Sequence, residues 1–250
     1  MSREAEAAVK QHEAVIQAMR ENGGYATLGH LYRTATRIPD SHWKGTKTPF
    51  ASIRRIVQEH KEFFKIRPGL WALESERKAV LSKLALDAKA DARNPEEFNH
   101  SYYQGLLVQI GNLNKYETFV PNQDKNRLFL SRKLSDISTM KQFHNFTYDS
   151  LLKRARTIDV SWFNQRQLPE AFFEVEHSTD IQNSLLKFLE FQDFRIKFYI
   201  VADNARRKEF ESKIARHVFK PIRSEVVFRD YDYVADWHSK MAALADLDNR

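Results

Sequence analysis

The sequence predicts a two-domain protein of the α+β or α/β class: a small head of three helices and a β-hairpin, then a larger body whose central mixed β-sheet is flanked by helices. Three observations predict this class. Helical periodicity dominates the first 60 residues and gives way to a short strand–turn–strand pattern. Residues 74–97, rich in Ala, Lys, Asp and Glu, follow as a helical connector. From residue 98 onward, helical and strand patterns alternate.

The head covers residues 1–73. Its first helix is expected over residues 4–21, and Thr27 is placed to cap a short second helix. Thr48-Pro49 opens the third helix, with Thr at the N-cap and Pro at the first helical position. Residues 63–73 read as a hairpin around a Pro-Gly turn. Three helices followed by a β-hairpin form a winged helix-turn-helix.

The sequence pattern of the body, residues 98–250, predicts helices on both sides of a strand-rich centre. In chain order we expect a helix over 98–111, a strand over 116–120, a poorly periodic region over 123–156 that ends in a basic helical stretch (149–156), strands over 157–162 and 171–176, a helix over 179–191, a strand over 196–202, a helix over 205–218, a strand over 225–228 and a C-terminal helix. This order suits a central mixed sheet flanked by helices.

Composition excludes several classes of site. The chain has no cysteine, so disulfides and thiolate zinc sites are absent. It contains no HExxH, GxxxxGK[ST], GxGxxG or GxSxG motif, which argues against zinc hydrolases, nucleotide-binding loops and serine nucleophile elbows. No run of eighteen apolar residues and no signal-peptide core is present, so we expect a cytoplasmic protein. The net charge of +7 suits a polyanionic partner without identifying one.

Three acidic residues in two strand-like runs form the main candidate site. Asp159 lies in the first run, and Glu174 and Glu176 lie in the second. Because side chains alternate along a strand, Glu174 and Glu176 are expected on one face. Carboxylates in an apolar strand need a partner, and a hard divalent cation such as Mg²⁺ is the natural one. The alternative is a set of salt bridges to the nearby basic residues Lys153, Arg154 and Arg156.

These runs resemble the PD-(D/E)XK nuclease superfamily, the fold of many restriction endonucleases. The resemblance rests on Ile158-Asp159-Val160 and on residues 173–179, and it covers roughly residues 98–230. It implies a restriction endonuclease-like body in which Asp159, Glu174 and the Val175 carbonyl hold Mg²⁺, and Glu176 orients or deprotonates the attacking water. One departure is that the final lysine of the family motif is Glu176 here, as in the ExE variant of some type II restriction enzymes.

Several other polar residues are candidates for support of this site. Lys187 could supply the missing positive charge, although a solvated helix charge is the favoured interpretation. His100 and Gln104 lie one helical turn apart and could hydrogen-bond a water at the metal, with an exposed polar face as the favoured alternative. Asn122 and Asp124 could reach the edge of the site, and a turn role explains them equally well.

The head resembles a HARE-HTH winged helix. The resemblance covers about residues 10–73 and rests on Trp43, Lys47-Thr48-Pro49, Ser52-Ile53, Phe64 and the run from Arg67 to Leu73. It implies a module that senses DNA sequence or base modification. Residues 36–67 hold eight basic residues against three acids, which favours DNA over the alternative of a protein-contact module.

The third helix, from Pro49 to His60, is expected to enter the major groove of DNA. The side chains expected to reach bases or phosphates are those of Ser52, Arg54, Arg55 and Gln58. The side chains expected to contact only the backbone are those of Lys44, Lys47, Lys65 and Arg67.

Taken together, these resemblances predict a Mg²⁺-dependent endonuclease of the restriction or defence type that cuts double-stranded DNA and possesses a reader for sequence or modified bases. Cutting both strands usually takes two active sites, so a homodimer is expected. The alternative is a non-catalytic DNA-binding regulator with a degenerate nuclease fold, which the glutamate at position 176 keeps open.

Overall fold

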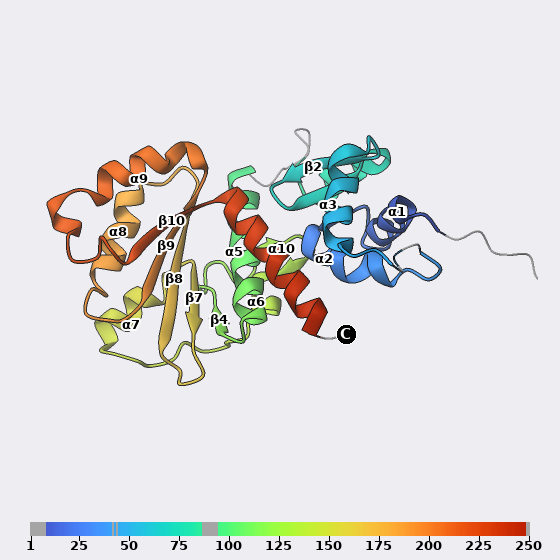
Figure 1. The fold of residues 1–250 in the computed structure, drawn as a ribbon. Coiled ribbons are helices and arrows are strands. Elements are labelled where there is room, and N and C mark those ends of the chain that lie inside the picture. Colours follow the sequence, from blue (N-terminus) through green and yellow to red (C-terminus); the bar gives the residue numbers. More distant parts are fainter. Residues whose placement is uncertain (1–8, 42, 44, 87–94, 249–250) are drawn as a thin grey trace, which may run out of the picture. The chain divides into compact units, whose positions relative to one another are not determined.

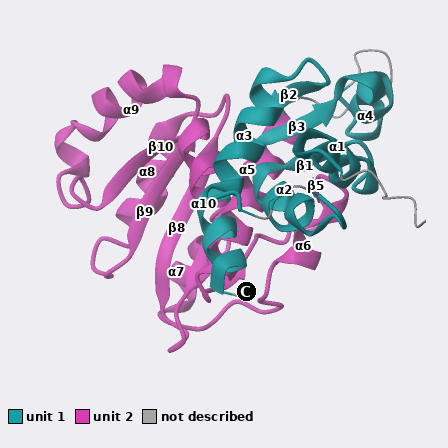
Figure 2. Ribbon diagram, turned by 45° about the vertical axis from the view of Figure 1, so that its right-hand side comes forward, with its two compact units in different colours: residues 1–90, 239–250 teal, residues 91–238 magenta. Residues whose placement is uncertain are grey.

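The computed structural model describes residues 9–41, 43, 45–86 and 95–248 of the 250-residue chain. The chain divides into two compact units, residues 1–90 with 239–250 and residues 91–238 (Figure 2). Each unit is described by itself. No helix among the described residues combines the length and the apolar character needed to cross a membrane.

The first unit is built from helices that pack beside a three-stranded antiparallel sheet of order β1-β3-β2. Its elements are α1 (Gln11–Glu21), β1 (Tyr25–Thr27), α2 (Leu28–Thr34), a 3-10 turn (Ala35–Arg37), α3 (Pro49–Glu59), β2 (Phe63–Arg67), β3 (Leu70–Leu73), a second 3-10 turn (Glu74–Glu76) and α4 (Arg77–Lys83). Buried side chains of α1, α2 and α3 share one hydrophobic core.

Most local signals in this unit act as expected. The Thr27 hydroxyl accepts a hydrogen bond from the His30 N–H and caps α2. Gly69 has a φ of 76° in the tight turn between β2 and β3. Two expectations were wrong: Thr48 makes no side-chain cap to α3, and β1, which pairs with β3, was not predicted. Of the connector, α4 is helical, and residues 87–94 lie outside the described part.

The second unit has a five-stranded mixed sheet of order β10-β9-β8-β7-β4. Strands β8, β9 and β10 run parallel, whereas β7 is antiparallel to both β8 and β4. The elements are α5 (Pro95–Leu113), β4 (Glu117–Phe119), β5 (Leu128–Phe129), β6 (Arg132–Lys133), α6 (Leu134–Ile137), α7 (Asp149–Ala155), β7 (Val160–Phe163), β8 (Pro169–Glu176), α8 (Ile181–Leu189), β9 (Lys197–Ala202), a 3-10 turn (Asn204–Arg206), α9 (Arg207–Ile214), a 3-10 turn (His217–Phe219), β10 (Val226–Asp230) and α10 (Tyr231–Asp248), whose residues from 239 onward count with the first unit.

Helices cover both faces of this sheet. Figure 1 shows α8 and α9 on one face and α5 on the other. Phe172 of β8 packs with Phe188 of α8 in the main core, whereas the indole N–H of Trp162 in β7 donates to the Leu107 carbonyl of α5. The mixed sheet flanked by helices is therefore confirmed. It is compatible with a restriction endonuclease-like fold.

Most element ends in the second unit differ from the expected ranges by a few residues, and two differences matter for the candidate site. Asp159 lies immediately before β7 and not within it, because strand pairing begins at Val160. The region 123–156 contains the hairpin β5–β6, which the sequence pattern did not reveal. Both differences bear on the site.

Candidate active site

Glu174 and Glu176 project from the same face of β8, as predicted. Both are buried, and the Ser184 hydroxyl of α8 contacts both carboxylates, at 3.1 Å from Glu174 Oε2 and in hydrogen-bond contact with Glu176 Oε1. The Thr179 hydroxyl also donates to Glu176 Oε2. Helix α8 and the turn before it therefore provide hydroxyl donors to the acidic end of β8.

Asp159 joins these two acids through the backbone of β8. The Val175 N–H donates to Asp159 Oδ2 over 2.8 Å. In a regular strand the N–H and C=O of one residue point to the same neighbour, so the Val175 carbonyl is expected on the Asp159 side as well. The structure thus brings Asp159, Glu174 and Val175 together across the β7–β8 junction.

Glu174 is in an unfavourable electrostatic position for a carboxylate. Burial raises the pKa of the Glu174 carboxyl above its usual range, and the charge of Asp159 raises it further, whereas Lys187 opposes both effects. The Lys187 ammonium lies 2.7 Å from Glu174 Oε2. Glu174 Oε1 is buried and makes no hydrogen bond within the described residues. One carboxylate oxygen is therefore left for a ligand.

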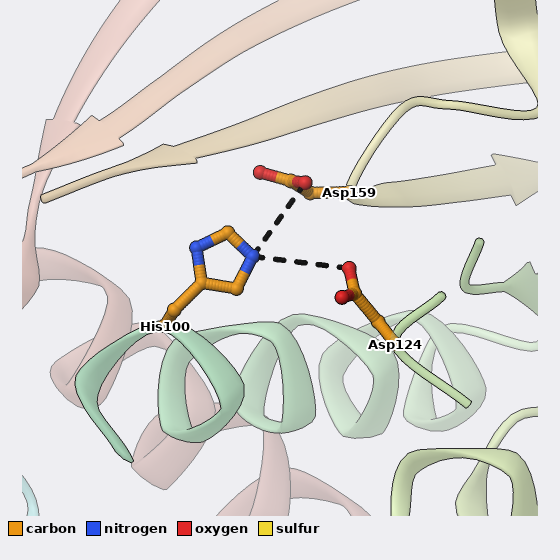
Figure 3. A group of neighbouring side chains, drawn as sticks. All are labelled: His100, Asp124 and Asp159. Carbon is orange, nitrogen blue, oxygen red and sulfur yellow. Dashed lines mark ion pairs between the residues drawn. The ribbon is translucent and has the colours of Figure 1, made fainter. Parts of the chain in front are cut away.

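A second cluster lies beside Asp159. His100 Nε2 is 3.6 Å from Asp159 Oδ1 and 3.9 Å from Asp124 Oδ2 (Figure 3). Burial alone would lower the pKa of His100, but the two adjacent carboxylates outweigh burial and raise the pKa to about 10. The two carboxylates therefore favour the protonated form of His100. The three side chains also have ligand atoms close enough together to hold a metal ion.

Gln104 ties this cluster to the end of β7. Its side-chain amide donates to Asp124 Oδ2 at 2.8 Å and to the Asp159 carbonyl at 3.1 Å. Burial alone would raise the pKa of Asp124, but His100, Gln104 and the charge of Arg127 together lower it below its usual range. Asp124 is thus a buried carboxylate whose ionised form is stabilised by His100, Gln104 and Arg127.

Three expectations from the sequence need correction. Lys187 is not a solvated helix charge, because its side chain is 22% exposed and pairs with Glu174. His100 and Gln104 do not form an exposed polar face, since Gln104 is fully buried. Of the basic residues considered as partners for the acids, Arg154 pairs with Glu190 instead. Asn122 is exposed, whereas Asp124 is buried in the cluster.

The acids open into a pocket of about 500 Å³. Its lining consists of Glu96, Glu97, His100, Arg127, Asp159, Glu174, Val175, Glu176, His177, Ser178, Thr179, Asp180, Asn183, Ser184 and Lys187. Arg127 was not among the residues predicted for the site. The only signal in the sequence is its position three residues after Asp124 in a turn, which would matter only if Asp124 had been assigned to the site.

The candidate DNA-contact residues of the first unit differ in exposure. Lys47, Arg55, Gln58 and Lys65 are exposed, and Ser52 and Arg67 are half-buried. The Arg67 guanidinium donates to the Ile66 carbonyl. Arg54 donates to the Ser239 hydroxyl at 3.0 Å and lies 3.5 Å from the Tyr32 hydroxyl, so its guanidinium is already engaged. Lys44 lies outside the described residues.

Sequence comparison connects the second unit to a known family. The family described as "Type II restriction enzyme NmeDI C-terminal domain" matches residues 81–244, about two thirds of the chain. The chain belongs to this family. All residues that line the pocket lie within the matched range, whereas the elements from α1 to β3 lie outside it.

One curated relative agrees with the NmeDI C-terminal domain family. The chain is 27% identical over 123 residues to "Type II restriction enzyme NmeDI" of Neisseria meningitidis serogroup C. The alignment covers 45% of this chain and 35% of that protein, so the chain matches about a third of the relative's length. No solved structure matches the chain significantly.

Proposed function

We propose that this chain is a Mg²⁺-dependent endonuclease of the restriction type that hydrolyses phosphodiester bonds of double-stranded DNA. The observation that carries the proposal is the convergence of Asp159, Glu174 and Glu176 in one pocket, inside the range that matches a restriction-enzyme family. We assign this pocket to the PD-(D/E)XK class, with Glu176 at the place of the usual lysine.

The donor set fits a hard divalent cation. Asp159 and Glu174 offer carboxylate oxygens, and Glu174 Oε1 is a buried acceptor with no hydrogen bond among the described residues. Asp159, Glu174 and the Val175 carbonyl would hold the ion, since Mg²⁺ favours oxygen ligands. When bound, Mg²⁺ would stabilise negative charge on the phosphoryl group and acidify the attacking water.

Glu176 is the proton acceptor in this proposal. Its carboxylate is oriented by the Thr179 and Ser184 hydroxyls and lines the same pocket as Asp159 and Glu174. A carboxylate held in this way can take a proton from an attacking water. Lys187 supplies a positive charge close to Glu174, which the usual lysine of the motif would otherwise supply. His100 and Gln104 hold Asp159 in place.

The first unit acts as the DNA reader in this proposal. Helices α1, α2 and α3, together with the β2–β3 hairpin, have the element order of a winged helix of the HARE-HTH type. The exposed side chains of Arg55 and Gln58 on α3 would reach bases, and Lys65 on β2 would contact phosphates. Sensing of modified bases and assembly as a homodimer, which supplies one active site per strand, belong to the same proposal.

A direct test is incubation of the purified chain with phage DNAs that carry modified or unmodified bases, in Mg²⁺ or in EDTA. We expect Mg²⁺-dependent cleavage of at least one DNA, with 5′-phosphate and 3′-hydroxyl ends, and no cleavage by Asp159→Ala. Sedimentation of the protein alone and with DNA tests the homodimer.

One observation favours a second candidate, a non-catalytic DNA-binding regulator. The Lys187 ammonium lies 2.7 Å from Glu174 Oε2 and so occupies one side of a proposed metal ligand. DNA binding without cleavage of any modified or unmodified DNA, together with no measurable uptake of Mg²⁺ or Mn²⁺ by calorimetry, would favour the regulator over the nuclease.

A further inference from the structure

Arg127 is a cationic residue of the acidic pocket to which the proposed hydrolysis assigns no role. It lies in the turn that precedes β5, and it lines the pocket with Asp159, Glu174 and Glu176. Its side chain is 35% exposed, which leaves it accessible to a ligand in the pocket.

A buried acid holds one edge of its guanidinium. Arg127 Nε is 3.1 Å from Asp124 Oδ1, and Asp124 is 1% exposed. The other Asp124 oxygen, Oδ2, accepts a hydrogen bond from the Gln104 amide, which fixes the orientation of this carboxylate. Among the described residues, none accepts a hydrogen bond from the two terminal nitrogens of Arg127. The guanidinium is therefore oriented through Nε and retains donors for a ligand.

The backbone of Arg127 is also fixed. Its N–H donates to the Asp124 carbonyl, and its own carbonyl accepts from the Leu134 N–H, both at 2.9 Å. The adjoining β5 is fastened to α5, where the Ser101 hydroxyl donates to the Leu128 carbonyl at 3.0 Å. The Phe129 ring fills the space above Gly105, where a Cβ atom would lie 2.1 Å from the ring. Arg127 is therefore preorganised relative to the helix that carries His100 and Gln104.

A further cation beside the carboxylates would favour entry of a phosphodiester, in addition to the proposed Mg²⁺ and to His100. Asp159, Glu174 and Glu176 repel a DNA phosphate, and Lys187 is engaged with Glu174 at 2.7 Å. An arginine presents several N–H donors in a planar fork that matches the oxygens of a phosphate. We infer that Arg127 binds a backbone phosphate of the DNA substrate next to the carboxylates. This inference rests on the proposed nuclease function and adds a phosphate-binding residue to it.

The experiment compares the full-length wild type with Arg127→Gln, Arg127→Lys and the control Arg132→Gln. Arg132 lies on the same hairpin, is exposed, does not line the pocket and donates to the Asp136 carbonyl. DNA affinity is measured in Ca²⁺ from low to moderate salt, and single-turnover cleavage is measured in Mg²⁺. Thermal unfolding of each variant reports on the fold.

We expect Arg127→Gln to weaken DNA binding by about ten-fold or more, as for loss of a charged hydrogen bond. The slope of the logarithm of the DNA-binding constant against the logarithm of the salt concentration should become less steep by about 0.9, the value for one phosphate contact. Single-turnover cleavage should slow. Arg127→Lys should keep the salt slope and recover part of the rate, because it keeps the charge without the fork. A role limited to supporting Asp124 would leave the salt slope unchanged.

Two results would overturn the inference. If wild type cleaves DNA and Arg127→Gln matches Arg132→Gln in affinity, salt slope and rate, Arg127 does not bind phosphate, and the nuclease function stands. If wild type neither binds nor cleaves any DNA, the nuclease function fails and the inference fails with it.

Discussion

The Lys187 ammonium and the Glu174 carboxylate form a 2.7 Å ion pair in which the acid is almost fully buried and the lysine is 22% exposed. The pair joins α8 to the acidic end of β8. Burial and the charge of Asp159 raise the pKa of Glu174 to about 8, and Lys187 opposes this rise and so favours the anionic form that can bind a metal ion. In the proposed nuclease site, Lys187 would thus supply from a neighbouring helix the positive charge that the PD-(D/E)XK motif usually has at position 176.

The first prediction concerns this ion pair. Lys187→Met removes the charge that lowers the pKa of Glu174, so that pKa rises further. Below the new pKa, each unit of increase reduces the ionised fraction about ten-fold. We expect slower single-turnover cleavage at pH 7 and partial recovery towards pH 9. Lys197→Met is the matched control. Lys197 also forms an ion pair with a glutamate of β8, Glu170, but it lies at the opposite end of β9 from the residue that is in register with Glu176. Equal pH–rate profiles for wild type and Lys187→Met would contradict the role.

The second prediction concerns the carboxylates. Asp159→Ala and Glu174→Ala should abolish Mg²⁺-dependent cleavage and leave DNA affinity largely intact, because each removes a proposed metal ligand. Glu170→Gln tests a carboxylate on the same strand outside the pocket, and it should cleave like wild type. Calorimetric titration with Mg²⁺ or Mn²⁺ should show weaker binding only for the first two variants. Undiminished cutting by either of them would remove that residue from the site.

The third prediction concerns stability against pH. The pKa of Asp124 is lower in the folded chain than in the unfolded chain. The resulting stabilisation is therefore present above the unfolded value of about 3.9 and is lost as the pH falls through the folded value. Asp124→Asn should be destabilised relative to wild type at pH 7, and the difference should shrink below about pH 4.

Urea unfolding at several pH values measures the stability of Asp124→Asn. The control Asp136→Asn changes an exposed aspartate of α6 and should stay within about 0.5 kcal/mol of wild type. A difference between wild type and Asp124→Asn that is the same at pH 3 and pH 7 would show that ionisation of Asp124 does not contribute.

The fourth prediction concerns the contact between α5 and β5. In Gly105→Ala the new methyl group would meet Phe129 Cβ, Cγ and Cδ2 at 2.7 Å or less, so the hairpin must shift. Overpacking of this kind lowers the free energy of unfolding by about 1–3 kcal/mol.

The same substitution bears on Arg127. Arg127→Gln should affect DNA binding less in the Gly105→Ala background, since the hairpin that holds Arg127 has moved. The double variant Gly105→Ala/Phe129→Ala should lose less stability than the sum of the single variants. Additive losses would show that the two residues are not in contact.

The fifth prediction concerns the first unit. Arg55→Ala should weaken DNA binding by about 1–3 kcal/mol and relax sequence choice if Arg55 reads a base. Lys65→Ala should weaken binding to all sequences alike and flatten the salt slope by about one unit. Arg54→Ala is less informative because Arg54 also contacts Ser239 and Tyr32. Lys78→Ala on α4 is a control for general charge. If Arg55→Ala and Lys65→Ala bind DNA like Lys78→Ala, the reader lies elsewhere.

Several features followed from the sequence because their causes are local. Alternation along one strand was enough to place Glu174 and Glu176 on one face. The Thr27 cap and the Pro68-Gly69 turn depend only on residues within a few positions, and both are present. The order of the main helices and strands around a mixed sheet also followed from periodicity, since the longer elements show their period.

The electrostatic character of the site was decided by tertiary structure. Asp124, in the turn after β4, meets His100 and Gln104 of α5, and Lys187 of α8 meets Glu174 of β8, so no local pattern reveals either contact. Strand β1 is three residues long and exists through its pairing with β3. The types and spacing of the acids were readable from the sequence. Their burial, their partners and the inclusion of Arg127 depend on which distant segments pack together, because burial and opposite charge set the ionisation of each group.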